Sequence, residues 1–534
     1  MNVMKKNIFS ISSLLSLVAF AALVTGCADH FDTSTPAGEK PAVVAEAEQL
    51  AQYETLVSYV DAEKFYLGNT LSFADLDEGT VAASLTLSNF NEVTIPNLFL
   101  HSEQVDNEGK VNVLLASSLA ADVSEKGINI FSSPLCASSN INNGYLEALI
   151  APETKYLPEV SGSDVIDFES DALGKTYPTQ KATGDAGPAT ASVKVENDPA
   201  GESGHVVHVK GATQCFPAIT IKFPDGRKLG DYTDLTLDFY AVNNFSYTSS
   251  VFLAMGGKNA VFKSPKDYGC TLKKWGRGKV SIPLAALAFS DEQMKQTEVT
   301  ILVGPQGVNC EFYIDNITLA YKYIPTYEVE KTAEEKFLLI GGALDDYITT
   351  AMEAAPSIDT WAVADCPVTS APNLIWKQNL GETYFGYAAS LMRAQRPDAK
   401  LFVSEYLMDA DVRATFLHLL TADAIGIDQI NGIDILMSID AATFDIDGFK
   451  AMLSELKATG RLIRLTIQSV TGTDTQAATA LGQAVAAYKQ QVPVAQQYGI
   501  TFGSVIESAS NGGLWTTAYN RKVTYASCAD ALNK

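Results

Sequence analysis

Basic residues are scarce in this sequence. The 534 residues include 38 Lys and Arg against 62 Asp and Glu, which gives a formal net charge of −24. Nucleic-acid phosphates would repel such a chain, so the composition argues against a nucleic-acid partner. The charge suits a protein that binds neutral ligands, although it identifies none. The apolar content of 47% is that of an ordinary globular protein, and the length predicts two or more domains.

Cysteines are few, and no two of them are spaced as CxxC. This scatter argues against a zinc cluster, which uses closely spaced ligand pairs. An extracytoplasmic location would permit disulfides, but the sequence does not decide whether any two cysteines pair. Apart from Cys27, the cysteines are Cys136, Cys215, Cys270, Cys310, Cys366 and Cys528.

The one long apolar run lies near the N-terminus, at Ile8–Leu23, and it is too short for a convincing membrane span. It follows two lysines and ends in LVTGC, which resembles a bacterial lipobox with acylation at Cys27. We therefore expect a signal peptide over 1–27 and a lipid anchor that places the protein on the outer membrane, exposed at the cell surface. The alternative is an ordinary secretory signal with an incidental cysteine. Residues 28–47, rich in Pro, Ala, Glu and Thr, are predicted to form a flexible tether.

Eight short apolar runs alternate with helical patterns in the rest of the chain. Near-continuous apolar strands separated by amphipathic helices indicate a parallel sheet, and eight such units predict an α/β fold of the (β/α)8 TIM-barrel type. Its functional site is expected at the C-terminal ends of the strands. The runs begin at Lys64, Asn91, Gly127, Thr360, Lys400, Ile430, Leu462 and Thr501, and the helical stretches include Ala333–Ala355, Glu382–Ala394, Ile446–Ala458 and Gln476–Tyr498.

A stretch with a different sequence pattern follows the third predicted strand. Short β runs such as HVVHVKG and LTLDFYAV follow one another, separated by Gly, Pro, Asp and Asn, with little helical periodicity. This pattern is typical of an all-β sandwich. We therefore predict that barrel segments 48–157 and 324–534 flank an inserted sandwich at 158–323, since surface loops tolerate long insertions.

Three barrel segments carry a family resemblance. FNEVTIPN (Phe90–Asn97), PDAKLFVSEY (Pro397–Tyr406) and ATGRLIRLTIQSV (Ala458–Val470) resemble, in this order, segments of glycoside hydrolase family 10, the endo-xylanases. Relatives from gut Bacteroidetes also carry a carbohydrate-binding sandwich after the third strand. The resemblance implies a TIM barrel and a xylan-related ligand.

The family's retaining mechanism needs two carboxylates about 5–5.5 Å apart. The resemblance places the acid/base at Cys366, after strand four, and the nucleophile at Ile467, on strand seven. Neither side chain supplies the required chemistry, so no catalytic residue is assigned.

Supporting positions of the family site are changed as well. Segments 97–100, 137–140 and 436–438 keep Asn97 and Asn140 but lose the family's Lys, His, Gln and Trp contacts. Together with Asp365 these two asparagines could form a secondary sugar site in the cleft. Carboxylates near predicted strand ends read either as solvated or capping groups or as a relocated catalytic pair; they are Asp365, Glu405, Asp434 and Glu507.

The predicted sandwich offers aromatic rings that could stack on sugar faces. Strand alternation in LTLDFYAV turns Tyr240 away from the core, and we select Tyr240, Tyr247 and Trp275 as candidate carbohydrate-binding residues. Core or surface packing is an equally good interpretation of each ring. Glu169 and Asp315 resemble the acidic residues that hold a structural calcium in carbohydrate-binding sandwich modules, a weak signal set against ordinary strand-end carboxylates. No other cofactor is predicted.

Three functions fit these observations. The leading hypothesis is a non-catalytic surface lipoprotein that captures xylan or a related plant polysaccharide, with components of an outer-membrane glycan importer as possible partners. The second is a family 10-like glycosidase with relocated carboxylates. The third is an adhesion or scaffold protein that binds no glycan.

Overall fold

The computed structural model describes residues 42–534 apart from 183–191, 203, 212–214 and 307–309. The chain divides into two compact units. Of the described residues, one unit combines 42–151 with Lys331–Lys534, and the other is Pro152–Glu330. The second unit begins and ends a few residues outside the predicted range 158–323. The added residues form a two-stranded ribbon, in which Glu153–Tyr156 (β4) is paired with Thr326–Val329 (β16).

The first unit is a closed barrel of eight parallel strands, as the sequence predicts. Neighbouring strands follow the chain order, and the last strand pairs with the first, so the α/β fold class is confirmed. The strands are β1 Tyr66–Thr70, β2 Glu92–Thr94, β3 Asn129–Phe131, β17 Thr360–Asp365, β18 Lys400–Glu405, β19 Gly432–Asp440, β20 Leu462–Thr471 and β21 Gln497–Phe502.

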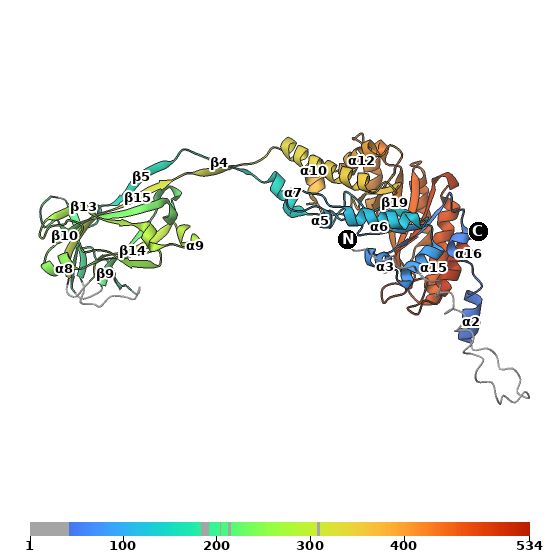
Figure 1. The fold of residues 1–534 in the computed structure, drawn as a ribbon, viewed down its shortest axis with the longest axis horizontal. Coiled ribbons are helices and arrows are strands. Elements are labelled where there is room, and N and C mark those ends of the chain that lie inside the picture. The colour runs from blue at the N-terminus through green and yellow to red at the C-terminus, as the bar shows by residue number, and fades with distance from the viewer. Residues whose placement is uncertain (1–41, 183–191, 203, 212–214, 307–309) are drawn as a thin grey trace, which may run out of the picture. The chain divides into compact units, whose positions relative to one another are not determined.

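Helices surround this barrel (Figure 1). Two long ones begin with reciprocal capping boxes: the side chains of Thr332 and Glu335 bond each other's backbone N–H groups, and Thr473 and Gln476 repeat the arrangement. The helices are α2 Ala42–Leu50, α3 Phe73–Glu78, α4 Val81–Asn89, α5 His101–Gln104, α6 Leu114–Glu125, α7 Asn143–Ile150, α10 Ala333–Ala354, α11 Ile375–Leu380, α12 Tyr384–Gln395, α13 Ala410–Leu420, α14 Ile446–Lys457, α15 Asp474–Gln491 and α16 Val523–Leu532.

The largest differences from the predicted boundaries lie near residue 42 and between residues 491 and 501. Residues 42–47, expected in the tether, belong to α2, because the segment AVVAEAEQL is rich in the strong helix formers Ala, Glu and Leu. The helix expected to run to Tyr498 ends at Gln491 instead, since Pro493 cannot continue it. The last barrel strand therefore starts at Gln497 rather than Thr501.

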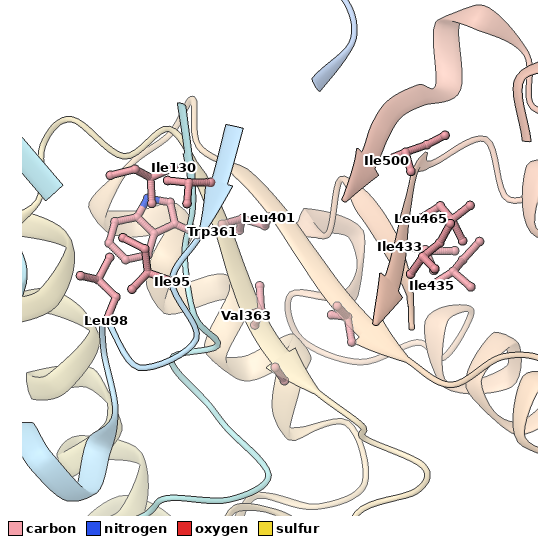
Figure 2. Close-up of a cluster of buried hydrophobic side chains, with 14 of the residues drawn as sticks. Ile95, Leu98, Ile130, Trp361, Val363, Leu401, Ile433, Ile435, Leu465 and Ile500 are labelled. Atoms are coloured by element: carbon pink, nitrogen blue, oxygen red, sulfur yellow. The ribbon is translucent and has the colours of Figure 1, made fainter. Parts of the chain in front are cut away.

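The barrel core is apolar on the side of the strands that faces the helices. Figure 2 shows part of it: Trp361 lies near Ile130 and Leu98, and Ile433 and Leu465 group on neighbouring strands. All five of these side chains are fully buried. Burial of this kind supplies the main stabilisation of a domain.

The second unit is a sandwich of two antiparallel sheets. One has the order β13-β10-β15-β8-β7, with β5 also paired to β15, and the other has the order β12-β11-β14-β9-β6. Their strands are β5 Val160–Ile166, β6 Thr179–Lys181, β7 Ser192–Asn197, β8 His205–Gly211, β9 Cys215–Lys222, β10 Tyr232–Ala241, β11 Val251–Met255, β12 Lys258–Val261, β13 Trp275–Pro283, β14 Glu298–Pro305 and β15 Cys310–Tyr323; two short helices are α8 Asn244–Thr248 and α9 Asp291–Met294. The runs predicted from sequence omitted β5, β6, β7 and β12, which are short or rich in polar residues.

The predicted signal peptide and lipidated Cys27 lie outside the described residues. Within the part of the chain that the structure describes, no helix has both the length and the apolarity needed to cross a membrane.

Candidate functional site

A pocket of about 470 Å³ lies at the C-terminal ends of the barrel strands. Asn140 and Asp365, two of the three predicted cleft residues, line it. Asn97 does not: it lines a neighbouring depression with Asn69 and Ile506. The structure therefore brings together only part of the predicted cleft set.

Asp365 ends β17 and holds the loop that follows β3. Its carboxylate accepts hydrogen bonds from the Ser138 backbone N–H at 2.7 Å and from the Ser138 hydroxyl at 2.8 Å. Both carboxylate oxygens therefore bond the end of β17 to the neighbouring loop that follows β3. This is the capping role that the sequence analysis gave as one interpretation of Asp365.

Cys366, at the expected acid/base position, has a backbone conformation with φ of 51°. Burial raises the pKa of its thiol to about 12, and the nearby Asp365 and Glu405 carboxylates add to the shift. The thiol is therefore protonated and uncharged at neutral pH. A group with this pKa neither donates a proton efficiently to a leaving sugar nor attacks as a thiolate.

Ile467, at the expected nucleophile position, points away from the pocket. Its side chain is 2% exposed and belongs to the apolar cluster between barrel and helices. The pairing of β19 with β20 shifts between Met437–Ile467 and Ser438–Ser469, which leaves Gln468 as the extra residue of a bulge. Gln468 lines the pocket instead, and its amide oxygen accepts a hydrogen bond from the Tyr406 hydroxyl at 2.9 Å.

Glu405 and Glu507, two other carboxylates near strand ends, are also held by hydrogen bonds. Glu405 is fully buried and accepts from the Val368 N–H at 2.8 Å and the Thr369 hydroxyl at 2.7 Å. Glu507 accepts from the Lys522 ammonium at 2.5 Å, which with a backbone hydrogen bond holds the pKa of its carboxyl below the usual range. A general acid needs a raised pKa, so Glu507 is poorly suited to that role.

Arg464 forms the floor of the pocket together with Asp434. Its guanidinium donates to Asp434 at 3.1 Å and to Glu92 at 3.3 Å, and it lies 3.6 Å from the centre of the Phe131 ring. Asp434 also accepts from the Ser404 and Thr466 hydroxyls, at 2.9 and 2.6 Å. The buried charges are thus paired and hydrogen-bonded to one another, and they form a polar network that fills the barrel interior beneath the pocket.

Four aromatic rings form a continuous row on the sandwich. Trp275 is paired with Tyr240, Tyr240 with Tyr313, and Tyr313 with His208, each directly across neighbouring strands β13, β10, β15 and β8. Their neighbours Phe239, Ile314 and Val207 point into the sandwich core, so the row lies on the opposite face of the sheet. With strands about 4.8 Å apart, the row spans roughly 14 Å.

Contacts within the row fix its shape. The rings of Tyr240 and Trp275 have centroids 5.4 Å apart, and those of Tyr240 and Tyr313 are 5.8 Å apart and nearly perpendicular at 88°. The indole N–H of Trp275 donates to Asp198 at 2.7 Å, and the Arg277 guanidinium lies 4.3 Å from the indole ring centre. The sequence analysis selected Tyr240 and Trp275 but not Tyr313 or His208, because the pairing of β8 with β15 and of β15 with β10 could not be predicted from the sequence.

Tyr247, the third predicted ring, does not join the row. It lies on α8 and packs against the sandwich core, half-buried. The alternative of core packing, considered from sequence, describes this residue.

The two predicted calcium ligands contact different groups. Glu169 accepts hydrogen bonds from the Gly204 and His205 N–H groups, at 3.1 and 3.2 Å. Asp315 is buried and accepts from the Arg277 guanidinium at 3.0 Å, so a cationic side chain already neutralises it. Across the described residues, no group of three or more His, Cys, Asp and Glu side chains is arranged to hold a metal ion. Glu169 and Asp315, with the partners that they already have, do not form a calcium site.

The fold and its sites define a (β/α)8-barrel protein with a β-sandwich inserted after the third strand. Residues 321–524, the barrel's second part, match the model of Glycosyl hydrolase family 10. The resemblance to this family is therefore confirmed over this part of the chain. No curated protein matches the chain.

Solved xylanase structures are similar to this chain at low identity. An endoxylanase from a sugarcane soil metagenome is 9% identical with a TM-score of 0.48, covering 89% of this chain and 99% of its own. Xylanase B from Clostridium stercorarium F9 is 12% identical with a TM-score of 0.47, covering 90% and 100%. Xylanase 10B from Thermotoga petrophila RKU-1, solved with xylobiose, is 12% identical with a TM-score of 0.47, covering 90% and 98%.

Proposed function

We propose that the protein is a non-catalytic glycan-binding lipoprotein of the bacterial cell surface, which captures xylan or a related plant polysaccharide. The observation that carries the proposal is the row of Trp275, Tyr240, Tyr313 and His208, in register across four strands. The Trp275, Tyr240 and Tyr313 rings are partly exposed, whereas His208 is buried and supports Tyr313 from one side. Partly exposed rings of this kind offer apolar contact surfaces to sugars, while neighbouring polar groups can accept hydrogen bonds from hydroxyls.

The barrel supports the non-catalytic part of the proposal. A retaining glycosidase needs one carboxylate as nucleophile and a second, with a raised pKa, as acid. Here a protonated thiol and an outward-facing isoleucine occupy the matching positions, at Cys366 and Ile467. Asp365 and Glu405 accept hydrogen bonds from loop residues, and Asp434 is paired with Arg464 in the polar network of the barrel interior. We propose that the barrel serves as a scaffold and that most affinity resides in the sandwich.

The anchor completes the proposal. The lipobox-like LVTGC sequence motivates an outer-membrane lipoprotein, placed where a polymer can be captured before import. Lipidation of one cysteine would hold the protein at the membrane while the sandwich remains free to bind polysaccharide.

Affinity electrophoresis of the full chain against a panel of plant polysaccharides tests glycan binding. Isothermal titration with xylo-oligosaccharides, on the full chain beside the excised unit 152–330, then locates the site. We expect both proteins to bind with similar affinity. Binding by the full chain alone would move the site to the barrel pocket, and absence of binding to every polysaccharide would favour the adhesion or scaffold hypothesis.

A reducing-sugar assay with xylan tests catalysis. We expect no turnover above background. Turnover that survives purification and disappears in Asp365→Asn would establish the relocated-carboxylate hypothesis instead, because Asp365 is the carboxylate that lines the pocket at a strand end.

A further inference from the structure

One segment of the sandwich is strongly basic, although the whole chain carries a net charge of −24. Residues 258–279 contain seven lysines and arginines and only one acidic residue, Asp267. Within the described part of the chain, five exposed lysines of this segment form no ion pair with a carboxylate. They are Lys263, Lys266, Lys273, Lys274 and Lys279.

Two of these lysines stand at the β13 end of the aromatic row. Lys273 and Lys274 directly precede Trp275 in the sequence. The backbone N–H of Lys273 donates to the carbonyl oxygen of Ala241 at 2.9 Å, and Ala241 follows Tyr240 on β10. Lysine carries its ammonium group on a flexible four-carbon stem, so both charges can reach a ligand that lies on these two rings.

The two sides of the row differ in charge. Because neighbouring strands are antiparallel, residues that follow the ring of β13 lie on the same side as those that precede the ring of β10 and follow the ring of β15. On this side Arg277 contacts the buried Asp238 and Asp315 at 2.9 and 3.0 Å. Asp198 and Glu202 each lie 3.9 Å from the same guanidinium, so four carboxylates share one cation.

The opposite side of the row holds Lys273 and Lys274 together with Lys210 and Glu311, which are paired across β8 and β15. The Glu311 carboxylate contacts the Lys210 ammonium and the His208 imidazole, both at 3.2 Å. The two lysines before Trp275 are left without such a partner in the described chain. A ligand on the rings therefore has positive charge available on one side only.

We infer that the row binds a glycan that bears uronic acids, and that Lys273 and Lys274 hold the uronate carboxylate. This inference rests on the proposed function and names its ligand class. The rings contact the neutral sugars, and the ammonium groups form charge-assisted hydrogen bonds with the carboxylate, which are stronger than those between neutral groups. At physiological ionic strength charges more than about 8 Å apart are largely screened, so these nearby lysines outweigh the distant acidic groups of the chain.

Glucuronoxylan and the same polymer after reduction of its carboxyl groups are matched probes, because only the uronate charge is removed. Isothermal titration of the full chain measures both affinities, at about 0.15 M and about 1 M salt. We expect glucuronoxylan to bind roughly fivefold more tightly than its reduced form at the lower salt concentration, as two exposed ion pairs would provide. The difference should shrink at the higher concentration, where the ion pairs are screened.

Charge-removing variants locate the effect. The double substitution Lys273→Gln with Lys274→Gln should abolish the preference for glucuronoxylan and leave binding of the reduced polymer within about twofold. Lys222→Gln with Lys295→Gln is the matched control, because it removes two charges from exposed positions at the end of β9 and after α9. This control should keep the full preference. Melting temperatures show that each variant is folded.

The possible failures are distinguishable. Equal affinity for the two polymers, or equal loss of the preference in both double variants, would overturn uronate recognition alone. Binding to phosphatidylglycerol vesicles that depends on Lys273 and Lys274, without a preference between the polymers, would assign these lysines to a lipid surface instead. Failure of the full chain to bind any polysaccharide would overturn the proposed function, and this inference with it.

Discussion

The imidazole of His208 lies flat on the phenol ring of Tyr313, with centroids 4.2 Å apart and planes 11° from parallel. The two residues are directly paired across β8 and β15. Both imidazole nitrogens contact carboxylates, Glu196 at 2.9 Å and Glu311 at 3.2 Å, so the ring is held from either edge. The Tyr313 ring is therefore held in place by its neighbours. If the row binds a glycan as we propose, this fixed position lowers the entropy cost of binding.

Removing a ring from the row should weaken glycan binding without unfolding the sandwich. Each stacking ring is expected to contribute on the order of 1 kcal/mol, so Tyr240→Ala and Tyr313→Ala should each lower affinity roughly fivefold. Isothermal titration with the best-binding oligosaccharide measures the loss, and melting temperatures report on folding.

Two aromatic residues outside the row serve as controls for this prediction. Phe245→Ala removes a ring that is 41% exposed on α8 and should leave affinity unchanged. Tyr247→Ala should instead cost roughly 1–3 kcal/mol of stability, because this ring packs against the core. An affinity loss in Phe245→Ala as large as in Tyr313→Ala would contradict the assignment of the row.

Restoring a carboxylate at the expected nucleophile position should fail. Ile467→Glu would bury a carboxylate in the apolar cluster, and we expect a loss of at least about 2 kcal/mol in unfolding free energy with no xylan hydrolysis. Gln468→Glu places the same group in the pocket and should be tolerated within about 1 kcal/mol. Chemical denaturation measures both variants. Equal stability losses would show that Ile467 does not face the core.

Acid should destabilise the barrel through His101. This side chain is 2% exposed, and burial lowers its pKa to about 4 from an unfolded value near 6.5. Because the pKa of His101 is lower in the folded protein, the unfolded chain binds the proton more tightly between pH 6.5 and pH 4. The contribution of His101 to the unfolding free energy is therefore complete above pH 6.5, and about 3 kcal/mol of it is lost as the pH falls to 4.

Unfolding free energies measured from pH 7 to pH 4 test this contribution. The unfolding free energy of His101→Asn should fall less steeply over that range than that of the unchanged protein. The unfolding free energy of His418→Asn, a change at an exposed position, should fall as steeply as that of the unchanged protein. Identical slopes in all three proteins would exclude His101 as a source of the acid sensitivity.

The anchor prediction depends on sequence alone. Cys27→Ser should prevent acylation and release the protein from the membrane fraction, because the thiol is the acceptor of the lipid. Fractionation followed by immunoblotting measures the distribution. Retention of the variant in the membrane fraction would contradict the lipoprotein interpretation.

The barrel was predictable because its signals are local. Apolar strand runs such as those around Phe402 and Ile433 and capping pairs such as Thr332 and Glu335 follow from the residues themselves. The end of α15 was misplaced only because the helical pattern continued past Pro493. Cys366 and Ile467 could likewise be recognised from sequence as unsuited to the family chemistry.

Tertiary structure decided which side chains share a face. The closing of the barrel decided which face of β20 is the core: Leu465 and Ile467 pack against the helices, while Arg464, Thr466 and Gln468 alternate with them and line the pocket. The aromatic row depends on pairing between strands distant in the chain, such as His208 with Tyr313. Sequence alone determined the alternation within each strand, whereas the register between strands, fixed by packing of the whole sandwich, brought the four rings together.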